Sequence, residues 1–273
     1  MTQPSNPSPS ALRTIILTTV AMIAFAANSV LCRQALGEGH IDAASFTSVR
    51  MIAGAATLLI ILLLRRAPRS ATTANWKSAA MLFLYMAFFS FAYISLGAGT
   101  GALLLFGAVQ LTMFSVALFR GEHFSILSWV GLLAAIGGLI YLVSPGVSAP
   151  NFTGAAMMIA SGIAWGVYSL MGKASKDPLE ATARNFIYGI PLVLIVSALF
   201  WGEMQVAPKG FFLALASGAL ASGCGYVLWY AVLPHLTATR AATVQLTVPA
   251  IAALGGVLLL AEPASERMLI AAI

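Results

Sequence analysis

The stretches AFAANSVLCR (24–33) and AWGVYSLMGK (164–173) decide the fold of this chain, because the second repeats the first. Laid over each other at a shift of 140 residues, they share a serine, and Lys173 falls on Arg33. Polar residues are rare in so apolar a sequence, so their coincidence carries more weight than the shared alanines. The two stretches indicate that the chain contains an internal duplication.

The same shift of 140 residues holds near the far end of the two copies. There Glu262 falls on Glu122, and Ser265 falls on Ser125. We count five hydrophobic spans in each copy. Because five is an odd number, the second copy must enter the membrane from the opposite side. Inverted-topology repeats of this kind are found in many transporters that work by alternating access.

Composition places the chain in a lipid bilayer. Of its 273 residues, 60% are hydrophobic and 8% are charged, whereas a soluble domain carries about 25% charged residues. A membrane-spanning helix takes about 20 apolar residues, so the chain holds about ten. The hydrophobic runs lack the alternation of a membrane β-barrel. We therefore predict an all-α integral membrane protein with ten transmembrane helices in a 5+5 inverted-topology repeat.

The duplication also divides the chain. Residues 1–12 begin with a polar, Pro- and Ser-rich stretch that predicts a disordered cytoplasmic tail, 13–150 form repeat 1, and 151–273 form repeat 2. The last span begins at residue 266 and is truncated at Ile273. We expect the natural protein to continue by roughly ten to twenty residues and complete this span. The predicted spans are 13–35, 43–64, 76–96, 100–119, 126–145, 152–172, 181–201, 209–233, 239–260 and one from 266.

The segment that begins at Arg13 has a second interpretation. It could be a signal peptide with a cleavage site before Ala27. Its counterpart at 153–175 lies deep inside the chain, where no signal peptide can be, and this favours a retained first span.

Lys and Arg predict the orientation. If the N-terminus is cytoplasmic, ten of the 14 basic residues fall in cytoplasmic loops and three in outer loops, as the positive-inside rule requires. This distribution at helix ends explains the net charge of +6 without a nucleic-acid partner. We predict a multi-pass protein of the bacterial inner membrane, in contact with lipid. The sequence leaves the oligomeric state open, a monomer included.

Three further segments carry a resemblance to a known family. They are GALASGCGYVLWYAVLPHLTATRAATVQLTVPAIAALGGVLLLAE (218–262), TGALLLFGAVQLTMFSVALFRGE (100–122) and SFTSVRMIAG (45–54). The first resembles the second-repeat signature of the EamA branch of the drug/metabolite transporter superfamily, and the others resemble its first repeat. The chain departs from the family at Val109 and Gln110, where many members carry a nearby Pro.

The resemblance implies a secondary transporter without a cofactor and without enzymatic activity. The polar and aromatic character of the spans is similar to that of bacterial aromatic amino-acid exporters. We therefore expect an amino acid, or a related small amphipathic metabolite, as the substrate. A multidrug or nucleotide-sugar carrier is the alternative within the superfamily. An integral-membrane enzyme is the alternative outside it, although we find no paired acids, metal-ligand spacing or Ser/His/Asp set.

Polar and aromatic side chains inside the spans are the candidates for a binding pocket, because lipid offers polar groups no partner. Aromatic faces and amides together suit a zwitterion with an apolar side chain. Packing between helices and the aromatic belts at the membrane surface are the other roles open to these residues. The candidates are Asn28, Tyr85, Phe89, Gln110, Trp165, Tyr168, Tyr226, Trp229 and Gln245.

Four residues are candidates for bending or gating. Pro191 and Pro249 fall inside spans, where Pro removes a helical hydrogen bond and permits a kink. Gly255 and Gly256 permit bending or the close approach of another helix. Ordinary helix packing is the competing interpretation.

Charged residues offer few functional candidates. All eight acids fall in loops or at helix ends, so we expect no intramembrane carboxylate to drive transport and no metal site. Arg50 lies two turns into its span and could meet a substrate carboxylate. We favour a structural role for Arg50, with its side chain reaching the outer headgroups. For Glu122 and Glu262 we expect a structural role, either capping of the following helix start or pairing with a basic neighbour such as Arg120 or Arg267.

Overall fold

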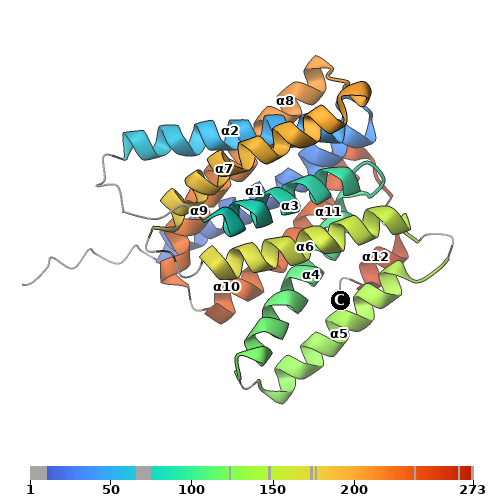
Figure 1. Cartoon of the computed structure of the whole chain (residues 1–273). Helices are drawn as coiled ribbons and strands as arrows, with labels where there is room; N and C mark the ends of the chain where they lie inside the picture. The colour runs from blue at the N-terminus through green and yellow to red at the C-terminus, as the bar shows by residue number, and fades with distance from the viewer. Residues whose placement is uncertain are drawn as a thin grey trace, which may run out of the picture.

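The computed structural model describes residues 11–65, 75–122, 124–146, 149–172, 175, 177–236, 238–263 and 265–271. These residues form helices joined by short connections (Figure 1), and no strand occurs among them beyond one isolated bridge between Ile41 and Val206. The all-α fold is therefore confirmed. Most of the predicted tail lies outside the described residues, and Ala11 already belongs to the first helix.

Within the described residues, eight helical segments are long and apolar enough to cross a membrane. Two more predicted spans are shorter: α3 (Trp76–Ala92) has 17 residues and α12 (Glu266–Ala271) has six. The unbroken long helices are α1 (Ala11–Gly37), α2 (Ala43–Leu64), α4 (Ala98–Phe119), α5 (Ile126–Val143), α6 (Phe152–Gly172) and α7 (Pro178–Leu199).

Side-chain caps explain where several helices begin. Asp42 precedes α2 and accepts a hydrogen bond from the Ser45 backbone N–H at 2.8 Å. Asp177 precedes α7 and accepts one from the Glu180 N–H at 3.1 Å, and Pro178 occupies the first turn. Such caps satisfy backbone donors that the first helical turn leaves without partners. Both acids therefore act in helix starts at the ends of spans.

The eighth predicted span is interrupted in its middle, which the sequence did not predict. It consists of α8 (Pro208–Ala216), a π-helical segment (Ser217–Cys224) called the π segment below, α9 (Gly225–Val232) and a short 3₁₀ turn (Leu233–His235). The π segment packs against α1 and α2. Wide turns of this kind are rare and are frequently found at functional sites.

The ninth predicted span is also broken. It consists of α10 (Ala238–Gln245) and α11 (Thr247–Leu260), and the interruption lies at Leu246. Pro249, in the first turn of α11, has no N–H to donate to the Gln245 carbonyl, and this missing bond accounts for the break. In contrast, α7 continues as one helix through Pro191.

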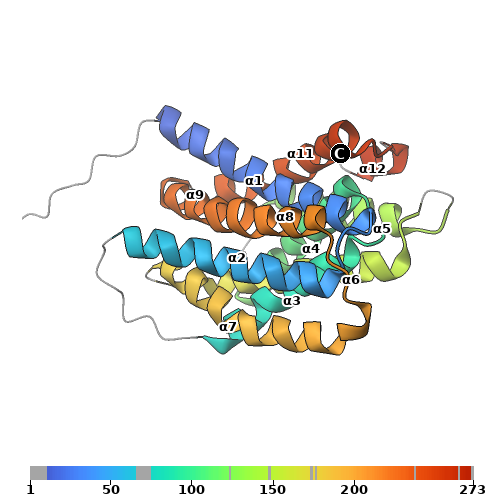
Figure 2. The same ribbon diagram turned by 90° about the horizontal axis from the view of Figure 1, so that it is seen from above.

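The two halves of the chain exchange packing partners. The first helix of the first half, α1, packs against α9 and α11 of the second half. The first helix of the second half, α6, packs against α3 and α4 of the first half, and α2 packs against α7 (Figures 1 and 2). Corresponding helices thus make corresponding contacts, and the centre of the bundle is shared by both halves.

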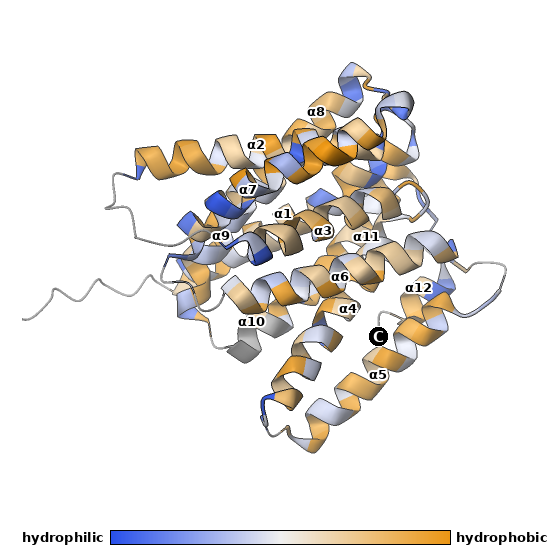
Figure 3. Cartoon of the chain, in the orientation of Figure 1, coloured by the Kyte–Doolittle hydropathy of each residue, from blue (hydrophilic) through white to orange (hydrophobic). Residues whose placement is uncertain are grey.

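Hydrophobic residues predominate along the helix bodies, and hydrophilic residues gather at several helix ends and loops (Figure 3). Large hydrophobic side chains remain exposed on many of the helices. Among the described residues of α5, Leu142 alone is buried. Such a surface suits a lipid environment and would not be stable in water.

Candidate functional site

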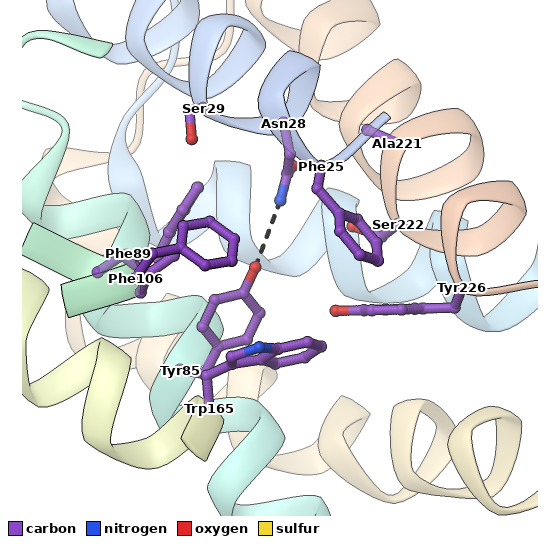
Figure 4. A pocket seen from close by; sticks show the side chains of 11 residues that line it. Phe25, Asn28, Ser29, Tyr85, Phe89, Phe106, Trp165, Ala221, Ser222 and Tyr226 are labelled. Carbon is purple, nitrogen blue, oxygen red and sulfur yellow. Dashed lines mark hydrogen bonds between the residues drawn. The ribbon is translucent and has the colours of Figure 1, made fainter. Parts of the chain in front are cut away.

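A pocket lies inside the bundle, between the two halves of the chain (Figure 4). Helices α1, α3 and α4 form its wall from the first half, and α6, the π segment and α9 form its wall from the second half. Its lining residues are Phe25, Asn28, Ser29, Tyr85, Phe89, Leu105, Phe106, Trp165, Ala221, Ser222 and Tyr226.

Aromatic rings dominate the pocket wall. The Trp165 ring lies 4.8 Å from the Tyr85 ring and is stacked on the Tyr226 ring at 5.4 Å, centroid to centroid. Phe25 approaches Tyr226 at 5.8 Å, and Phe89 approaches Tyr85 at 5.6 Å. Figure 4 shows these rings around one space. They offer flat apolar faces that could hold an apolar or aromatic group.

Polar groups meet at one side of the pocket. The Asn28 amide nitrogen donates to the Tyr85 hydroxyl at 3.4 Å, as the dashed line in Figure 4 marks. The Ser217 hydroxyl donates to the Asn28 side-chain oxygen at 2.5 Å. Asn28 is 5% exposed. The π segment brings Ser217 to this chain of hydrogen bonds, which ties α1 to α3 and to the second half.

Arg50 extends this polar group behind the pocket wall. Its side chain is fully buried, so the expected position at the outer headgroups is wrong. Its Nη2 donates to the Tyr85 hydroxyl at 2.9 Å and its Nε donates to the Ser222 hydroxyl at 3.3 Å. Its guanidinium carbon lies 4.8 Å from the centre of the Phe89 ring. The Tyr85 and Ser222 hydroxyl groups and the aromatic faces of Tyr85 and Phe89 hold the cation inside the bundle.

Of the nine pocket candidates predicted from the sequence, the structure places five in the pocket wall. These are Asn28, Tyr85, Phe89, Trp165 and Tyr226. The other four lie elsewhere, as the next two paragraphs describe.

Tyr168 and Trp229 belong to the aromatic cluster around the pocket without lining it. Tyr168 is buried and donates to the Thr182 hydroxyl at 3.1 Å, while its ring lies 5.5 Å from that of Trp165. Trp229 is 7% exposed and packs edge-on against Phe25 at 6.1 Å. Both residues therefore support lining residues from behind.

Gln110 and Gln245 do not line the pocket. Gln110 is half-buried on α4. Gln245 ends α10, and its side-chain nitrogen donates to the Ala241 carbonyl oxygen at 3.1 Å. The Gln245 amide is thus used locally, at the break between α10 and α11.

Six lining residues were not among the pocket candidates predicted from the sequence: Phe25, Ser29, Leu105, Phe106, Ala221 and Ser222. Phe25 carried a usable signal, because it is the repeat counterpart of Trp165. Ser222 could not be recognised, since the π segment alone turns it toward Arg50. Leu105 and Phe106 have the same residue types as the surrounding apolar core.

The four gating candidates occupy different environments. Pro191 is exposed on α7 and Pro249 is buried at the start of α11. Gly255 and Gly256 lie inside α11, where added Cβ atoms would approach Val30 Cγ2 to 2.8 Å and Glu262 Oε2 to 2.7 Å. At both glycines the small size permits close packing, and a role in bending stays a prediction.

Glu262 connects the two halves near the ends of α1 and α11. Its Oε1 lies 2.9 Å from Arg33 Nε, and its Oε2 accepts from the Ala98 N–H at 2.8 Å. Glu262 therefore caps the start of α4, whereas capping of the helix that follows it was expected. At that helix, α12, the Ser265 hydroxyl accepts from the Met268 N–H at 3.2 Å. The expected partner was wrong, because Glu262 pairs with Arg33, whereas Arg267 donates to the Ser144 carbonyl oxygen at 2.6 Å.

Acidic residues are not found among the side chains that line this pocket. In the part of the chain that the structure describes, no group of three or more His, Cys, Asp or Glu residues could hold a metal ion. The chemistry of the pocket is thus aromatic and hydrogen-bonding, with one buried cation behind its wall.

Comparisons with known proteins bear on this architecture. The EamA-like transporter family matches residues 12–144 and again residues 152–273. A protein of Pseudomonas aeruginosa described as uncharacterized is 50% identical over 256 residues, which cover 94% of this chain and 89% of that protein. A solved structure described only as a crystal structure of a protein aligns with a TM-score of 0.64 at 18% identity. It covers 93% of this chain and 91% of its own, which shows the shared fold.

A more distant relative has a named activity. The threonine/homoserine exporter RhtA of Escherichia coli is 31% identical over 166 residues, which cover 58% of this chain and 54% of that protein. The doubled family match agrees with the internal duplication and with helices that exchange partners between the halves. This chain belongs to the EamA-like transporter family of multi-pass membrane proteins.

Proposed function

We propose that this protein is a secondary transporter that exports amino acids, aromatic ones among them, or similar small amphipathic metabolites across the bacterial inner membrane. The single observation that carries the proposal is the pocket between the halves, where stacked rings of Tyr85, Trp165 and Tyr226 adjoin the Asn28 amide. An apolar side chain fits the rings, and polar ends fit the amide and hydroxyl groups. The exporter activity named for the relative RhtA supports the same substrate class.

We propose alternating access as the mechanism. Each half supplies its first helix to the third and fourth helices of the other half, so a rocking of one half against the other would change access to the shared pocket. The N-terminus is cytoplasmic in this proposal, because Lys and Arg then gather on the inner side. The interruptions at the π segment and at Leu246 provide places where the second half could bend, with Pro249 beside the second.

Coupling to protons through a carboxylate has no support in the pocket, since acids are not among its lining residues. Exchange or facilitated diffusion is the proposed mode. A multidrug carrier for cations is the less favoured alternative, because a buried arginine stands behind the wall.

Counterflow in proteoliposomes tests the proposal. Vesicles preloaded with unlabelled L-phenylalanine should accumulate labelled L-phenylalanine transiently, and L-threonine should be tested in parallel. We expect Trp165→Ala to reduce exchange at least tenfold, because it removes the ring that contacts both Tyr85 and Tyr226. Leu133→Ala, on the exposed surface of α5, is the matched control and should exchange normally. Folded protein that exchanges a nucleotide sugar or a cationic dye, and no amino acid, would contradict the proposal.

A further inference from the structure

The hydroxyl groups around Arg50 are all used as acceptors. The Tyr85 oxygen accepts from Arg50 Nη2 at 2.9 Å and from Asn28 at 3.4 Å. The Ser222 oxygen accepts from Arg50 Nε at 3.3 Å. A hydroxyl has one proton of its own to donate, and within the described residues neither of these two protons has an acceptor. Two wall residues of the pocket therefore present hydroxyl donors that have no acceptor in the part of the chain that the structure describes.

The guanidinium itself is also incompletely satisfied. Arg50 is fully buried, and its Nη1 has no hydrogen-bond partner among the described residues. The five ion pairs found in the described part of the chain all use other basic residues. The guanidinium carbon of Arg50 instead lies 4.8 Å from the centre of the Phe89 ring and 5.3 Å from that of the Tyr85 ring. Aromatic faces stabilise a cation only partly. A buried charge without a counter-ion is costly.

The unpaired donors, and a positive charge that has no counter-ion among the described residues, indicate which kind of ligand would fit here. It must be an anion that accepts several hydrogen bonds at once. A carboxylate has two oxygens with about four acceptor sites. One oxygen bound to the Tyr85 or Ser222 hydroxyl would lie about 6 Å from the guanidinium, two hydrogen-bond lengths away. At that distance inside a low-dielectric bundle the attraction is strong.

We infer that Arg50 is the anion-recognition residue of the pocket and that the substrate carries a carboxylate beside its apolar body. Tyr85 and Ser222 donate to the carboxylate, and Arg50 fixes the direction of both hydroxyls and supplies the compensating charge. The inference rests on the proposed function and deepens it, because it states which end of an amphipathic metabolite is required. The aromatic rings of Trp165 and Tyr226 then take the apolar end.

Analogues test this without altering the protein. The reference compound is L-phenylalanine. L-Phenylalaninol and phenylalanine amide lack its carboxylate, and 3-phenylpropionate lacks its ammonium group. Thermal stabilisation of the purified protein measures binding, and competition against phenylalanine counterflow measures transport. We expect L-phenylalanine to bind at least about tenfold more tightly than phenylalaninol and the amide, the loss expected when buried polar groups stay unpaired. Binding of 3-phenylpropionate would identify a simple organic anion as sufficient, and its exclusion would indicate a zwitterion.

Variants locate the effect at Arg50. We expect Arg50→Gln to weaken phenylalanine binding on the order of 30-fold or more, as for a buried charge partner, and to abolish the preference over phenylalaninol. Arg50→Lys should retain part of that preference. Arg65→Gln is the control, since Arg65 pairs with Asp177 at the far end of α2. If Arg50→Gln does not fold, Ser222→Ala removes one donor alone and should weaken phenylalanine but not phenylalaninol.

The outcomes separate the two proposals. Equal binding of phenylalaninol and phenylalanine, or an unchanged preference in folded Arg50→Gln, overturns the role of Arg50. Carboxylate-dependent stabilisation without counterflow supports Arg50 and overturns the transport proposal. Counterflow without a carboxylate preference supports the transport proposal and overturns the role of Arg50. If neither counterflow nor a carboxylate preference is observed, both proposals are overturned.

Discussion

Arg33 at the end of α1 and Glu262 just after α11 form an ion pair across the two halves, with Nε 2.9 Å from Oε1. Both side chains also hold the connection between α3 and α4. Arg33 Nη1 donates to the carbonyl oxygens of Tyr93 and Ile94 at 3.2 and 3.1 Å, and Glu262 accepts from the Ala98 N–H. The pair therefore joins four helices at one end of the bundle, the outer end if the N-terminus is cytoplasmic.

Breaking this pair should open that end of the bundle. Cys32 precedes Arg33 and is fully buried, so its thiol reports access. In a Cys224→Ser background, we expect Glu262→Gln to raise the rate of Cys32 labelling by a membrane-impermeant maleimide about tenfold. A tenfold change corresponds to a loss of about 1.4 kcal/mol in the stability of the closed state relative to the open state. A loss of this size fits the removal of one partner from a partly buried ion pair. Unchanged labelling in Glu262→Gln would show that the pair does not close this end.

The approach of the π segment to α2 depends on Gly218. A Cβ there would collide with the Arg50 carbonyl oxygen and come within 2.8 Å of Ala53 Cβ. We expect Gly218→Ala to destabilise the protein by about 1–3 kcal/mol through overpacking, measured as a lower melting temperature. Gly131→Ala on α5, where a Cβ would meet nothing within 4 Å, is the matched control. It should be neutral or slightly stabilising, because alanine favours helix. Equal effects of the two substitutions would contradict close packing at Gly218.

The sequence predicted the helices, the duplication and half of the pocket, for physical reasons that differ by residue. Apolar runs and repeated polar residues are local signals, and the helices and the matching contacts of the two halves agree with them. Trp165 and Tyr85 were recognisable because large polar-edged rings inside a span need a partner. Ser222 was not recognisable, and Arg50 was expected to reach the headgroups, because the positions of these two side chains depend on a π turn and on burial in the middle of the bundle. The residue types in the stretch SGALASGC (217–224) do not predict a π-helical turn.

A small ion cluster should contribute weakly to stability and in a pH-dependent manner. Glu38 accepts hydrogen bonds from Lys209 at 2.8 Å and from His40 at 2.7 Å, and these bonds lower its pKa below the ordinary 4.5. The lowered pKa means that the stabilisation is present at neutral pH and is lost as the pH falls through the folded value. Since Glu38 is half-exposed, we expect Glu38→Gln to cost less than about 1 kcal/mol at pH 7.

Melting temperatures across pH check this expectation. The difference between the wild type and Glu38→Gln should shrink as the pH falls below the ordinary 4.5 and through the lowered pKa of Glu38, where the wild-type carboxylate takes up a proton. A difference that persists unchanged at lower pH would show that the Glu38 charge is not the stabilising feature.

Tyr85→Phe should affect both stability and exchange, because one oxygen serves two buried donors. Its removal leaves Arg50 Nη2 and the Asn28 amide without their acceptor, while the ring contacts with Trp165 and Phe89 can remain. We expect a loss of about 1–3 kcal/mol, seen as a lower melting temperature, and a decrease in phenylalanine counterflow. Tyr141→Phe makes the same chemical change on the exposed face of α5 and should alter neither measurement. If Tyr85→Phe exchanges normally and melts like the wild type, the Tyr85 hydroxyl does not organise the pocket, and Arg50 must be held by Ser222 and the aromatic faces alone.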